Sequence, residues 1–557
     1  MRIYKFIFFF LNYLKLNDWI KIFINYLLVF FTIIFEILFI YFFYLILNKN
    51  NNFENPEKFI NKIILFINDY LKLDLYILSN QILFLCFCII LKNIFQLYQN
   101  FFFNNFIYKL TAKKATSIFS HYLNFDYEKF KKRNISTYSK NILRDVENVI
   151  LGIFGFWIYI IGDLFYIFSI IFLSSYFIFF EFSISHLFLF ILIIIGLLLI
   201  YRLSIKIGQI RSDNEALAFK VLNESFNFFK EININRKNIF FSDRFSKYIN
   251  KYYYSKAISA LINIVPKFFL EIGFILFFYL SFVNSYLSIE SFISRFSILV
   301  IIIFRVLQPL SRIFSYVSAM LNNLESFKIL YNDLKFSFNT SNSKKSFSVN
   351  NIKMKNISYS VKLANDEKKI IKEFNYKFTK GMIYGLYGKS GSGKTTLLLL
   401  IAGLLRHYTG KIYFNDKKVN LDNIFKKYSI SYLPQNPSLF DENFIFNIFL
   451  NNSASSDDLK KARFLLKNFN FKNILNSEKF IDTIKNFSGG ERQRIGFIRS
   501  IIKCPQVLLL DEPTSALDRI NEKLIFDYLK MIKKDMIIIV STHKIGHKKY
   551  FDRIVKI

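Results

Sequence analysis

Residues 388–396 read Gly-Lys-Ser-Gly-Ser-Gly-Lys-Thr-Thr and have the form GxxxxGK[ST]. In such a loop successive backbone N–H groups surround phosphate oxygens, the lysine reaches the terminal phosphates, and the hydroxyl group binds Mg²⁺. Lys394 and Thr395 occupy those two positions. The other predicted phosphate-binding residues are Gly388, Ser390, Gly391, Ser392, Gly393 and Thr396. By itself, the loop predicts only that a nucleotide and Mg²⁺ bind.

Two adjacent carboxylates could do chemistry on that nucleotide. Asp511 ends the apolar run VLLLD, and Glu512 follows it. A carboxylate at the end of a strand can hold Mg²⁺ directly or through water. The next carboxylate is then the candidate general base that takes a proton from the attacking water. The alternative is that both are ordinary surface acids after a strand. A third motif, FSGGERQR, begins at Phe487.

Short strands alternating with helices would position these residues. From about Ile352, IYGLYG runs into the phosphate loop, LLLLIAGLL follows as a helix, and VLLLD and MIIIVSTH are continuous apolar runs. Such runs are typical of parallel strands that are buried on both faces. Residues 351–557 are therefore predicted to form an α/β P-loop NTPase domain. The Ser- and Asn-rich segment 331–350 is predicted to be a linker.

Residues 1–330 have a different character, because Phe, Ile, Leu and Tyr dominate them in long runs. Six of these runs are long enough, at about 20 residues or more, to cross a bilayer. They lie at 22–47, 75–100, 149–172, 176–201, 262–283 and 290–318. We therefore predict an all-α transmembrane domain with six helices.

The distribution of Lys and Arg predicts the orientation of this domain. The segments 101–148 and 202–261 are rich in both, whereas 173–175 and 284–289 contain neither. By the positive-inside rule, both long segments, both termini and the ATP-binding domain are cytoplasmic in a plasma (inner) membrane. The helical spacing of apolar residues in 109–148 indicates that the long segments extend the spans as helices.

Each pair of helical extensions needs a short turn, and we place the two turns near Phe125–Lys129 and Phe226–Lys230. Both turns are expected to dock on ATP-binding domains and to couple them to the membrane domain.

The formal net charge of +34 suggests either a nucleic acid or an anionic surface as partner. The basic residues, however, are spread through the chain without a dense run or a nucleic-acid motif. The abundance of Lys, Asn, Ile, Phe and Tyr is typical of AT-rich codon usage. We therefore predict no nucleic-acid partner.

With its three motifs in this order, segment 352–557 resembles the nucleotide-binding domain of ABC transporters over nearly its whole length. The resemblance implies ATP and Mg²⁺ as cofactors. It also implies that Gln435, in SYLPQNPSLF, contributes to the metal site and to catalysis. His543, in VSTHK, matches the switch histidine that contacts the γ-phosphate.

The resemblance also implies a second copy of the chain. Ser488, Gly489 and Gly490 match the signature motif, which in that family faces the nucleotide of another subunit, and residues 515–518 match the D-loop. Because one chain carries one of each motif, we expect a homodimer with two ATP molecules at its interface.

The sequence departs from the family pattern in two places. One concerns the binding of adenine, and the other concerns the coupling of the ATP-binding domain to the membrane domain. The position that usually stacks on adenine is Val361 in NISYSVKL, and Tyr359 would stack on the base only if the register slips by two residues. The segment from Asp482 to Ser488 is shorter than the loop that usually contacts the membrane domain.

Within the apolar half, several stretches resemble lipid-linked oligosaccharide flippases, notably VPKFFLEIGF at 265–274 and FRVLQPLSRIFSYV at 304–317. Ionisable residues inside spans are costly, at about 2.5–3.5 kcal/mol each at a helix centre, and are functional candidates. They are Glu36, Lys92, Asp163, Glu271 and Arg305. We expect Arg305 to bind a diphosphate group of the cargo. The structural alternatives pair Glu36 or Glu271 with Arg305, or place Lys92 beyond the bilayer edge.

Together these features predict ATP-driven export or flipping of a substrate, with a lipid-linked saccharide as the expected cargo. The predicted partners are a second copy of the chain, membrane lipid and the transported substrate. A peptide, toxin or lipid exporter has the same architecture and is the alternative. Other classes that fit the motifs are a non-hydrolysing subunit of a heterodimeric transporter and a non-transporting ATPase of the same superfamily.

Overall fold

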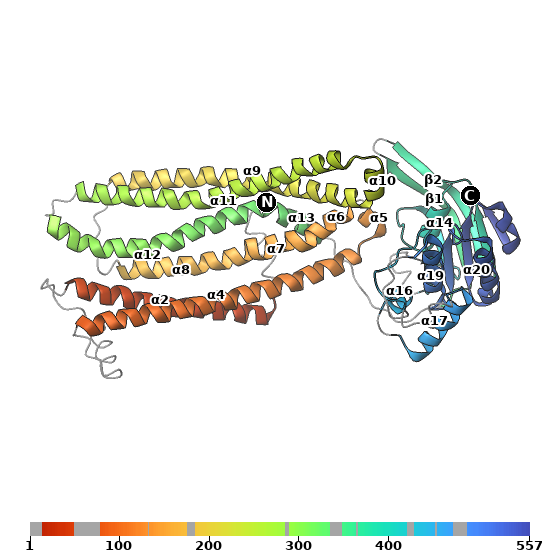
Figure 1. Ribbon diagram of the computed structural model, residues 1–557, viewed down its shortest axis with the longest axis horizontal. Helices are drawn as coiled ribbons and strands as arrows, with labels where there is room; N and C mark the ends of the chain where they lie inside the picture. The colour runs from red at the N-terminus through yellow and green to blue at the C-terminus, as the bar shows by residue number, and fades with distance from the viewer. Residues whose placement is uncertain are drawn as a thin grey trace. The chain divides into compact units, whose positions relative to one another are not determined.

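The computed structural model describes residues 14–48, 78–131, 133–174, 184–283, 289–334, 348–363, 366–419, 428–451, 454–471 and 487–557. The chain divides into two compact units (Figure 1). The first consists of Met1–Asn124 and Arg133–Ser337, and the second of Phe125–Lys132 and Phe338–Ile557.

In the described part of the first unit, six helices are long, and they confirm the predicted all-α membrane domain. They are α2 (Leu16–Asn48), α4 (Leu78–Leu123), α8 (Phe156–Ser174), α9 (Ile184–Asn227), α11 (Asn238–Val283) and α12 (Ile289–Asn322). Helices α2 and α4 pack along each other, as do α9 and α11, and α8 and α12. The shorter segments are α6 (Ile135–Lys140), η1 (Asn141–Asp145), α7 (Val146–Val149), η2 (Ile150–Gly155), α10 (Phe229–Ile234) and α13 (Leu324–Leu334).

The longest helices reach well past a bilayer. Helices α4 and α11 each contain 46 residues. At 1.5 Å per residue that is about 70 Å, compared with about 30 Å for the hydrocarbon core. The expectation that the long segments extend the spans as helices is therefore confirmed.

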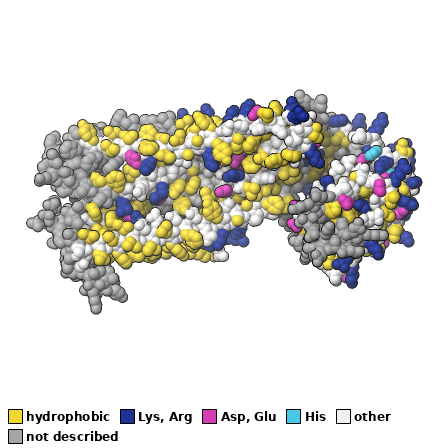
Figure 2. All heavy atoms as spheres, in the orientation of Figure 1, with side chains coloured by type: hydrophobic (Ala, Val, Ile, Leu, Met, Phe, Trp, Pro, Cys, Tyr) yellow, Lys and Arg dark blue, Asp and Glu magenta, His cyan; other side chains and the backbone are white. Residues whose placement is uncertain are grey.

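Apolar side chains cover much of the helical unit's visible surface (Figure 2). Within the described residues, three stretches are long and apolar enough to cross a membrane: Leu16–Ile40, Ser79–Leu123 and Ile135–Phe172. The other three predicted spans coincide with α9, α11 and α12, although 176–183 lies outside the described residues.

The second unit contains two sheets. The antiparallel sheet has the order β2-β1-β4-β5 and the parallel sheet the order β6-β7-β8-β3-β9. The strands are β1 (Asn351–Leu363), β2 (Asp366–Thr379), β3 (Ile383–Tyr387), β4 (Thr409–Phe414), β5 (Lys417–Lys418), β6 (Ile430–Leu433), β7 (Val507–Asp511), β8 (Ile537–Thr542) and β9 (Arg553–Lys556). The helical segments are α5 (Tyr127–Lys131), α14 (Lys394–Ile401), α16 (Phe444–Phe449), α17 (Ser456–Asn468), α19 (Gly489–Ile501), α20 (Arg519–Ile532), η5 (Lys533–Asp535) and η6 (Ile545–Tyr550).

Strand β7 shows why the continuous apolar runs fold in this way. Every residue of β7 and of β8 is buried. Val507 and Leu509 face one core cluster, with α14 and the antiparallel sheet, whereas Leu508 and Leu510 face the other, with α19 and α20. Because successive side chains of a strand point to opposite faces, a strand covered on both sides must be apolar throughout. The predicted α/β domain is confirmed.

The first predicted turn, near Phe125–Lys129, clusters with the second unit rather than with the helices that flank it in sequence. Asp126 forms an ion pair with Arg406, and Glu128 Oε2 lies 3.4 Å from His407 Nε2. Tyr127 packs against the core beneath the antiparallel sheet. The turn therefore binds the ATPase unit by charge and by apolar packing.

The predicted boundary regions are only partly described. Helix α13 continues to Leu334, into the range predicted as linker, and residues 335–347 lie outside the described part of the chain. Most of the short segment from Asp482 to Ser488 also lies outside it. The second predicted turn coincides with the break between α9 and α10, and its docking stays a prediction.

Candidate functional site

The phosphate loop connects the end of β3 to the start of α14. Gly393 has φ +101° and Gly391 has φ +81°, conformations that L-residues rarely adopt. A Cβ at Gly388 would lie 2.3 Å from Ser392 Oγ. Lys394 is almost buried, and its Nζ donates to the carbonyl oxygens of Gly388 and Lys389, both at 2.9 Å. The ammonium group is thus held inside the curve of the loop.

Asp511 is the centre of a hydroxyl cluster. Thr395 Oγ1 donates to its Oδ2 at 2.8 Å, and Ser541 Oγ donates to its Oδ1 at 2.6 Å. Tyr432 OH lies 3.4 Å from Oδ2, and burial, together with Asp511, raises the pKa of this phenol. A carboxylate beside a threonine hydroxyl is a hard-oxygen set that fits Mg²⁺ bound with a nucleotide. Ser541 and Tyr432 were not predicted.

Glu512 lies between two of the predicted catalytic residues. Gln435 Nε2 donates to Oε2 at 2.9 Å, and His543 Nδ1 lies 3.0 Å from Oε1. Its backbone has φ +46°, and its N–H donates to Ser541 Oγ at 3.0 Å. The structure thus brings together Glu512, Gln435 and His543, which follow β7, β6 and β8, at the carboxyl edge of the parallel sheet.

Ser488 is the N-cap of α19. Its Oγ accepts from Glu491 N–H at 3.2 Å, and its own N–H donates to Glu491 Oε2 at 2.8 Å, which is a capping box. A Cβ at Gly489 would lie 3.6 Å from Ala516 Cβ, and one at Gly490 would lie 3.0 Å from Ala516 O. The predicted signature residues therefore pack against the segment 515–518.

The family model described as "ABC transporter" matches residues 371–515. The ergothioneine transport ATP-binding protein EgtV of Helicobacter pylori is 35% identical over 191 residues, which are 33% of this chain and 84% of that protein. The chain belongs to the ABC transporters.

The similarity to full-length relatives is more distant. The putative export ATP-binding/permease protein RC1073 of Rickettsia conorii is 25% identical over 501 residues, 86% of this chain and 85% of the relative. The microcin-J25 export ATP-binding/permease protein McjD of Escherichia coli is 35% identical over 205 residues, and this match spans only 34% of that protein and 35% of this chain. A bacterial Atm1-family ABC exporter with ATP bound superposes with a TM-score of 0.77 at 15% identity, covering 97% of this chain and 93% of the other. The fold is that of an ABC exporter, and the C-terminal unit is its ATPase.

In this ABC transporter Tyr359, on strand β1, is mostly buried and its hydroxyl group is already hydrogen-bonded. Tyr359 is 9% exposed, and its hydroxyl donates to Glu128 Oε1 at 3.3 Å. Burial and the neighbouring Glu128 raise its pKa to about 12. Val361 is partly buried against the same core. Stacking of adenine on Tyr359 stays a prediction, but its hydroxyl already has a partner in the turn.

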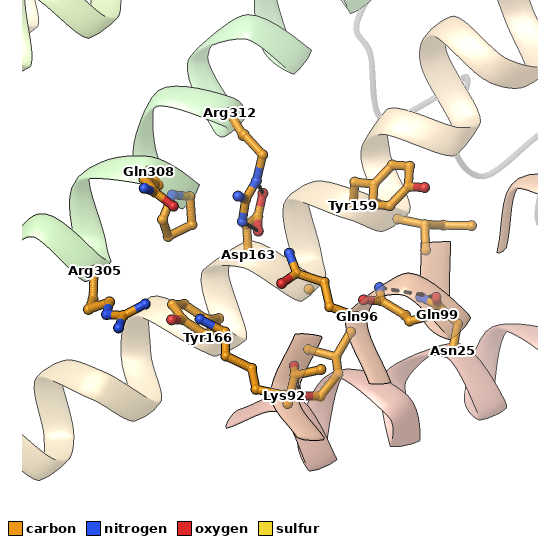
Figure 3. A pocket seen from close by; sticks show the side chains of 15 residues that line it. Asn25, Lys92, Gln96, Gln99, Tyr159, Asp163, Tyr166, Arg305, Gln308 and Arg312 are labelled. Atoms are coloured by element: carbon orange, nitrogen blue, oxygen red, sulfur yellow. Dashed lines mark hydrogen bonds and ion pairs between the residues drawn. The ribbon is translucent and has the colours of Figure 1, made fainter. Parts of the chain in front are cut away.

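The membrane domain of the transporter contains a polar cavity between α2, α4, α8 and α12 (Figure 3). Its polar lining residues are Asn25, Thr32, Lys92, Gln96, Gln99, Tyr159, Asp163, Tyr166, Arg305, Gln308 and Arg312. Lys92, Asp163 and Arg305 were predicted as functional candidates, whereas Arg312 was missed.

Arg305 is paired with Glu36, which is one of the structural alternatives named above, and its binding of a cargo diphosphate stays a prediction. Arg305 Nε lies 2.8 Å from Glu36 Oε1, and Lys92 forms an ion pair with the same fully buried carboxylate. Lys92 therefore has a partner inside the bundle. Glu271 instead pairs within its own helix, where its Oε1 lies 3.7 Å from Lys267 Nζ. A carboxylate inside the bundle offsets the cost of both cations.

Arg312 and Asp163 form a second, bidentate pair in the same cavity. Arg312 Nη2 donates to Asp163 Oδ1 at 2.6 Å, and its Nε donates to Oδ2 at 3.2 Å. The spacing of Arg305, Gln308 and Arg312 could have revealed this residue, because steps of three and four place all three on one helix face.

Proposed function

We propose that this ABC transporter is an exporter that works as a homodimer by alternating access. Two ATP molecules would close the two ATPase units on each other, and hydrolysis would reopen them. The relative from Rickettsia conorii, which is similar over most of the chain, is named as a putative exporter. The distribution of Lys and Arg supports cytoplasmic termini and ATPase units in a plasma (inner) membrane.

The ATP site carries the proposal. Lys394 and the backbone N–H groups of 388–396 would bind the phosphates, as the curled loop and its buried ammonium group support. Thr395, Asp511 and Gln435 would hold Mg²⁺, which neutralises phosphate charge when it is bound. The single observation that supports hydrolysis best is the Glu512 carboxylate, which Gln435 and His543 hold from both sides.

Glu512 then acts as the general base. An ionised carboxylate at this place can accept the proton of a water that attacks the γ-phosphate, and His543, 3.0 Å from the same carboxylate, would contact that phosphate. Gln435, which donates to the carboxylate, would orient it. Ser488, Gly489 and Gly490 would bind the nucleotide of the second copy from the start of α19.

Glu512→Gln tests the role of the base. The amide keeps the shape of the side chain but cannot accept the proton, so ATP should bind and turnover should fall by roughly 100-fold or more. ATP should then hold two copies in a long-lived closed dimer, seen by size-exclusion chromatography of the full chain. Glu442→Gln, at an exposed carboxylate in the same unit, is the matched control. Near wild-type turnover in E512Q would refute the assignment and favour the non-hydrolysing alternative.

Exposed apolar side chains support the second copy as partner. Phe226, Phe228 and Phe229, at the second predicted turn, are 71%, 57% and 62% exposed in the single chain. Such aromatic residues in a cytoplasmic turn would gain by burial in a partner's ATPase unit. A cysteine placed in this turn should crosslink to the second copy and not within one chain.

For the cargo we propose a molecule with an anionic group, a lipid-linked saccharide in the first instance. Three cations, Lys92, Arg305 and Arg312, line the cavity with one carboxylate, Asp163. The buried Glu36 pairs with Lys92 and Arg305, so among the described residues this group keeps one positive charge in excess. The amide groups of the cavity would bind hydroxyl groups. A peptide with a free carboxylate is the alternative, which the name of the Escherichia coli relative favours.

Cargo-stimulated ATPase activity separates these two cargoes. A lipid-linked diphosphate saccharide in vesicles should stimulate the wild-type transporter, whereas soluble peptides should not. Arg305→Ala should abolish the stimulation and leave the basal rate unchanged. Stimulation by peptides alone would refute the saccharide.

A further inference from the structure

One buried histidine near the ATP site has no part in the chemistry described so far. His547 lies in η6, four residues after His543, and is only 3% exposed. Its Nδ1 lies 2.9 Å from Thr542 Oγ1, and its Nε2 lies 2.9 Å from Glu522 Oε1. One ring nitrogen therefore contacts Thr542, the residue before His543, and the other contacts Glu522 on α20.

The partners of His547 are themselves fixed to the ATP site. Glu522 Oε2 accepts from Lys544 Nζ at 2.7 Å, and the same ammonium group lies 3.4 Å from Thr514 O. The carbonyl oxygen of Lys544 accepts from Tyr387 OH at 2.6 Å, and Tyr387 is the residue before the phosphate loop. The residues on both sides of His543 are thus held by β3 and by α20.

The hydrogen-bond pattern fixes the state of the imidazole ring. Thr542 Oγ1 accepts the N–H of Lys544 at 3.2 Å, so the hydroxyl proton is available for Nδ1 of His547. Nδ1 then accepts, and the Nε2 proton faces Glu522. Burial lowers the pKa of His547, although Glu522 opposes this effect, and Lys544 and His543 add to it. A neutral ring fits the hydrogen bond with Thr542, and its Nε2 lies 2.9 Å from Glu522 Oε1 without hydrogen-bond geometry.

We propose that His547 is a positioning residue for ATP hydrolysis, because it fixes the segment Thr542–Lys544 in the conformation that brings His543 to Glu512. The inference rests on the proposed roles of His543 and Glu512. His543 itself is more than half exposed, with Glu512 Oε1 3.0 Å away. Among the described residues its side chain has one polar contact, with Glu512, so its place depends on the backbone that His547 anchors.

The connection to Glu522 adds a second consequence. Helix α20 begins at Arg519, directly after the segment 515–518, which packs against Gly489 and Gly490 of the signature motif expected to face the second copy. Because Glu522 lies in the first turn of this helix, the contact with His547 joins that segment to the switch histidine. A change at the dimer interface can therefore reach His543 through the contact of Glu522 with His547 and the hydrogen bond of His547 with Thr542.

His547→Phe and Thr542→Val test the proposal in the full chain. Phenylalanine keeps the ring packing and removes both polar contacts, and valine keeps the β-branched shape of Thr542 without its hydroxyl. Misplacing a catalytic group by about 1 Å can cost on the order of 100-fold. We expect kcat for ATP to fall by roughly 10-fold in each variant, with KM changed by less than about twofold, because the phosphate loop is untouched.

Conservative variants separate positioning from general damage. Thr542→Ser keeps the hydroxyl and should keep the wild-type kcat. His547→Asn keeps an acceptor near the position of Nδ1 and should recover part of the loss. Lys549→Ala, at an exposed residue of η6, is the matched control and should be unchanged. If H547F does not fold, the T542V and T542S pair decides the question.

The variant His543→Ala distinguishes failure of the positioning role of His547 from failure of the catalytic role of His543. If H543A loses activity while H547F and T542V keep the wild-type kcat per folded molecule, the positioning role is overturned and the ATP site stands. If H543A also keeps its activity, the proposed role of His543 fails, and this inference fails with it. A loss of kcat in H547F and T542V that T542S does not share supports the proposal.

Discussion

Glu36 offers a sharp test of the charge arrangement in the membrane domain. Its carboxylate is fully buried and is shared by Lys92 and Arg305, the latter at 2.8 Å. Glu36→Gln would leave two cations side by side without a counter-charge. Removing one partner of a buried ion pair typically costs about 3–5 kcal/mol, because an uncompensated charge remains.

Removing one of the two cations should cost less. In Arg305→Met, Glu36 keeps Lys92, so the variant loses a charged contact without leaving the carboxylate unpaired. Such a contact contributes about 1.5–3 kcal/mol. The shared carboxylate therefore predicts an asymmetry, with E36Q roughly twice as destabilising as R305M.

The assay is thermal inactivation of the full chain in detergent, followed by size-exclusion chromatography at fixed protein concentration. Unfolding of such a protein is irreversible, so half-lives at one temperature are compared. The double variant E36Q/R305M removes one of the two stranded cations and should be more stable than E36Q alone. Glu271→Gln, at a half-exposed i,i+4 pair worth about 0.3–0.5 kcal/mol, is the control. A double variant less stable than E36Q would refute the shared-carboxylate reasoning.

The remaining predictions concern the ATPase unit and the end of α13. Lys394→Ala should weaken ATP binding through the loss of charge-assisted contacts, and unchanged affinity in a binding titration would contradict its role. Val361→Tyr should tighten ATP binding several-fold, since a stacked aromatic adds about 0.5–1.5 kcal/mol; if Tyr359→Ala instead abolishes a preference for ATP over GTP, Tyr359 is the stacking residue. Asp333→Ala breaks a 2.8 Å contact with Arg133 and should cost on the order of 2 kcal/mol, measured as a shorter half-life on heating.

The ATP site could be predicted largely from sequence because its residues stand at the ends of elements with their own local signals. A strand that is buried on both faces must be a continuous apolar run, and the residue after such a run lies at the carboxyl edge of the sheet. Asp511, Glu512 and His543 follow runs of this kind. Ser541 and Tyr432 could not be found in this way, since nothing in their residue type distinguishes them from other serine and tyrosine residues.

The ion pairs of the membrane domain depend on information that the sequence does not carry locally. Asp163 and Arg312 are 149 residues apart, and their meeting depends on which faces of α8 and α12 pack together. Long apolar runs predict that each helix exists but not its rotation, because nearly every face is apolar. The sequence therefore left Glu36 and Glu271 as alternative partners of Arg305, and the rotation of the helices decides for Glu36.

The turn at Phe125–Lys129 contacts the strand of the ATPase unit that is predicted to meet adenine. The segment from Asp482 to Ser488 is short in the sequence, and the turn at Phe125–Lys129 clusters with the ATPase unit. The turn carries Glu128, which accepts from the Tyr359 hydroxyl on β1. Strand β1 also carries Val361 at the position expected to meet adenine, two residues away on the same face. If Val361 meets adenine as predicted, base binding and the turn contact the same short stretch of β1, and Glu128→Gln, which weakens the contact with Tyr359, should change the affinity for ATP.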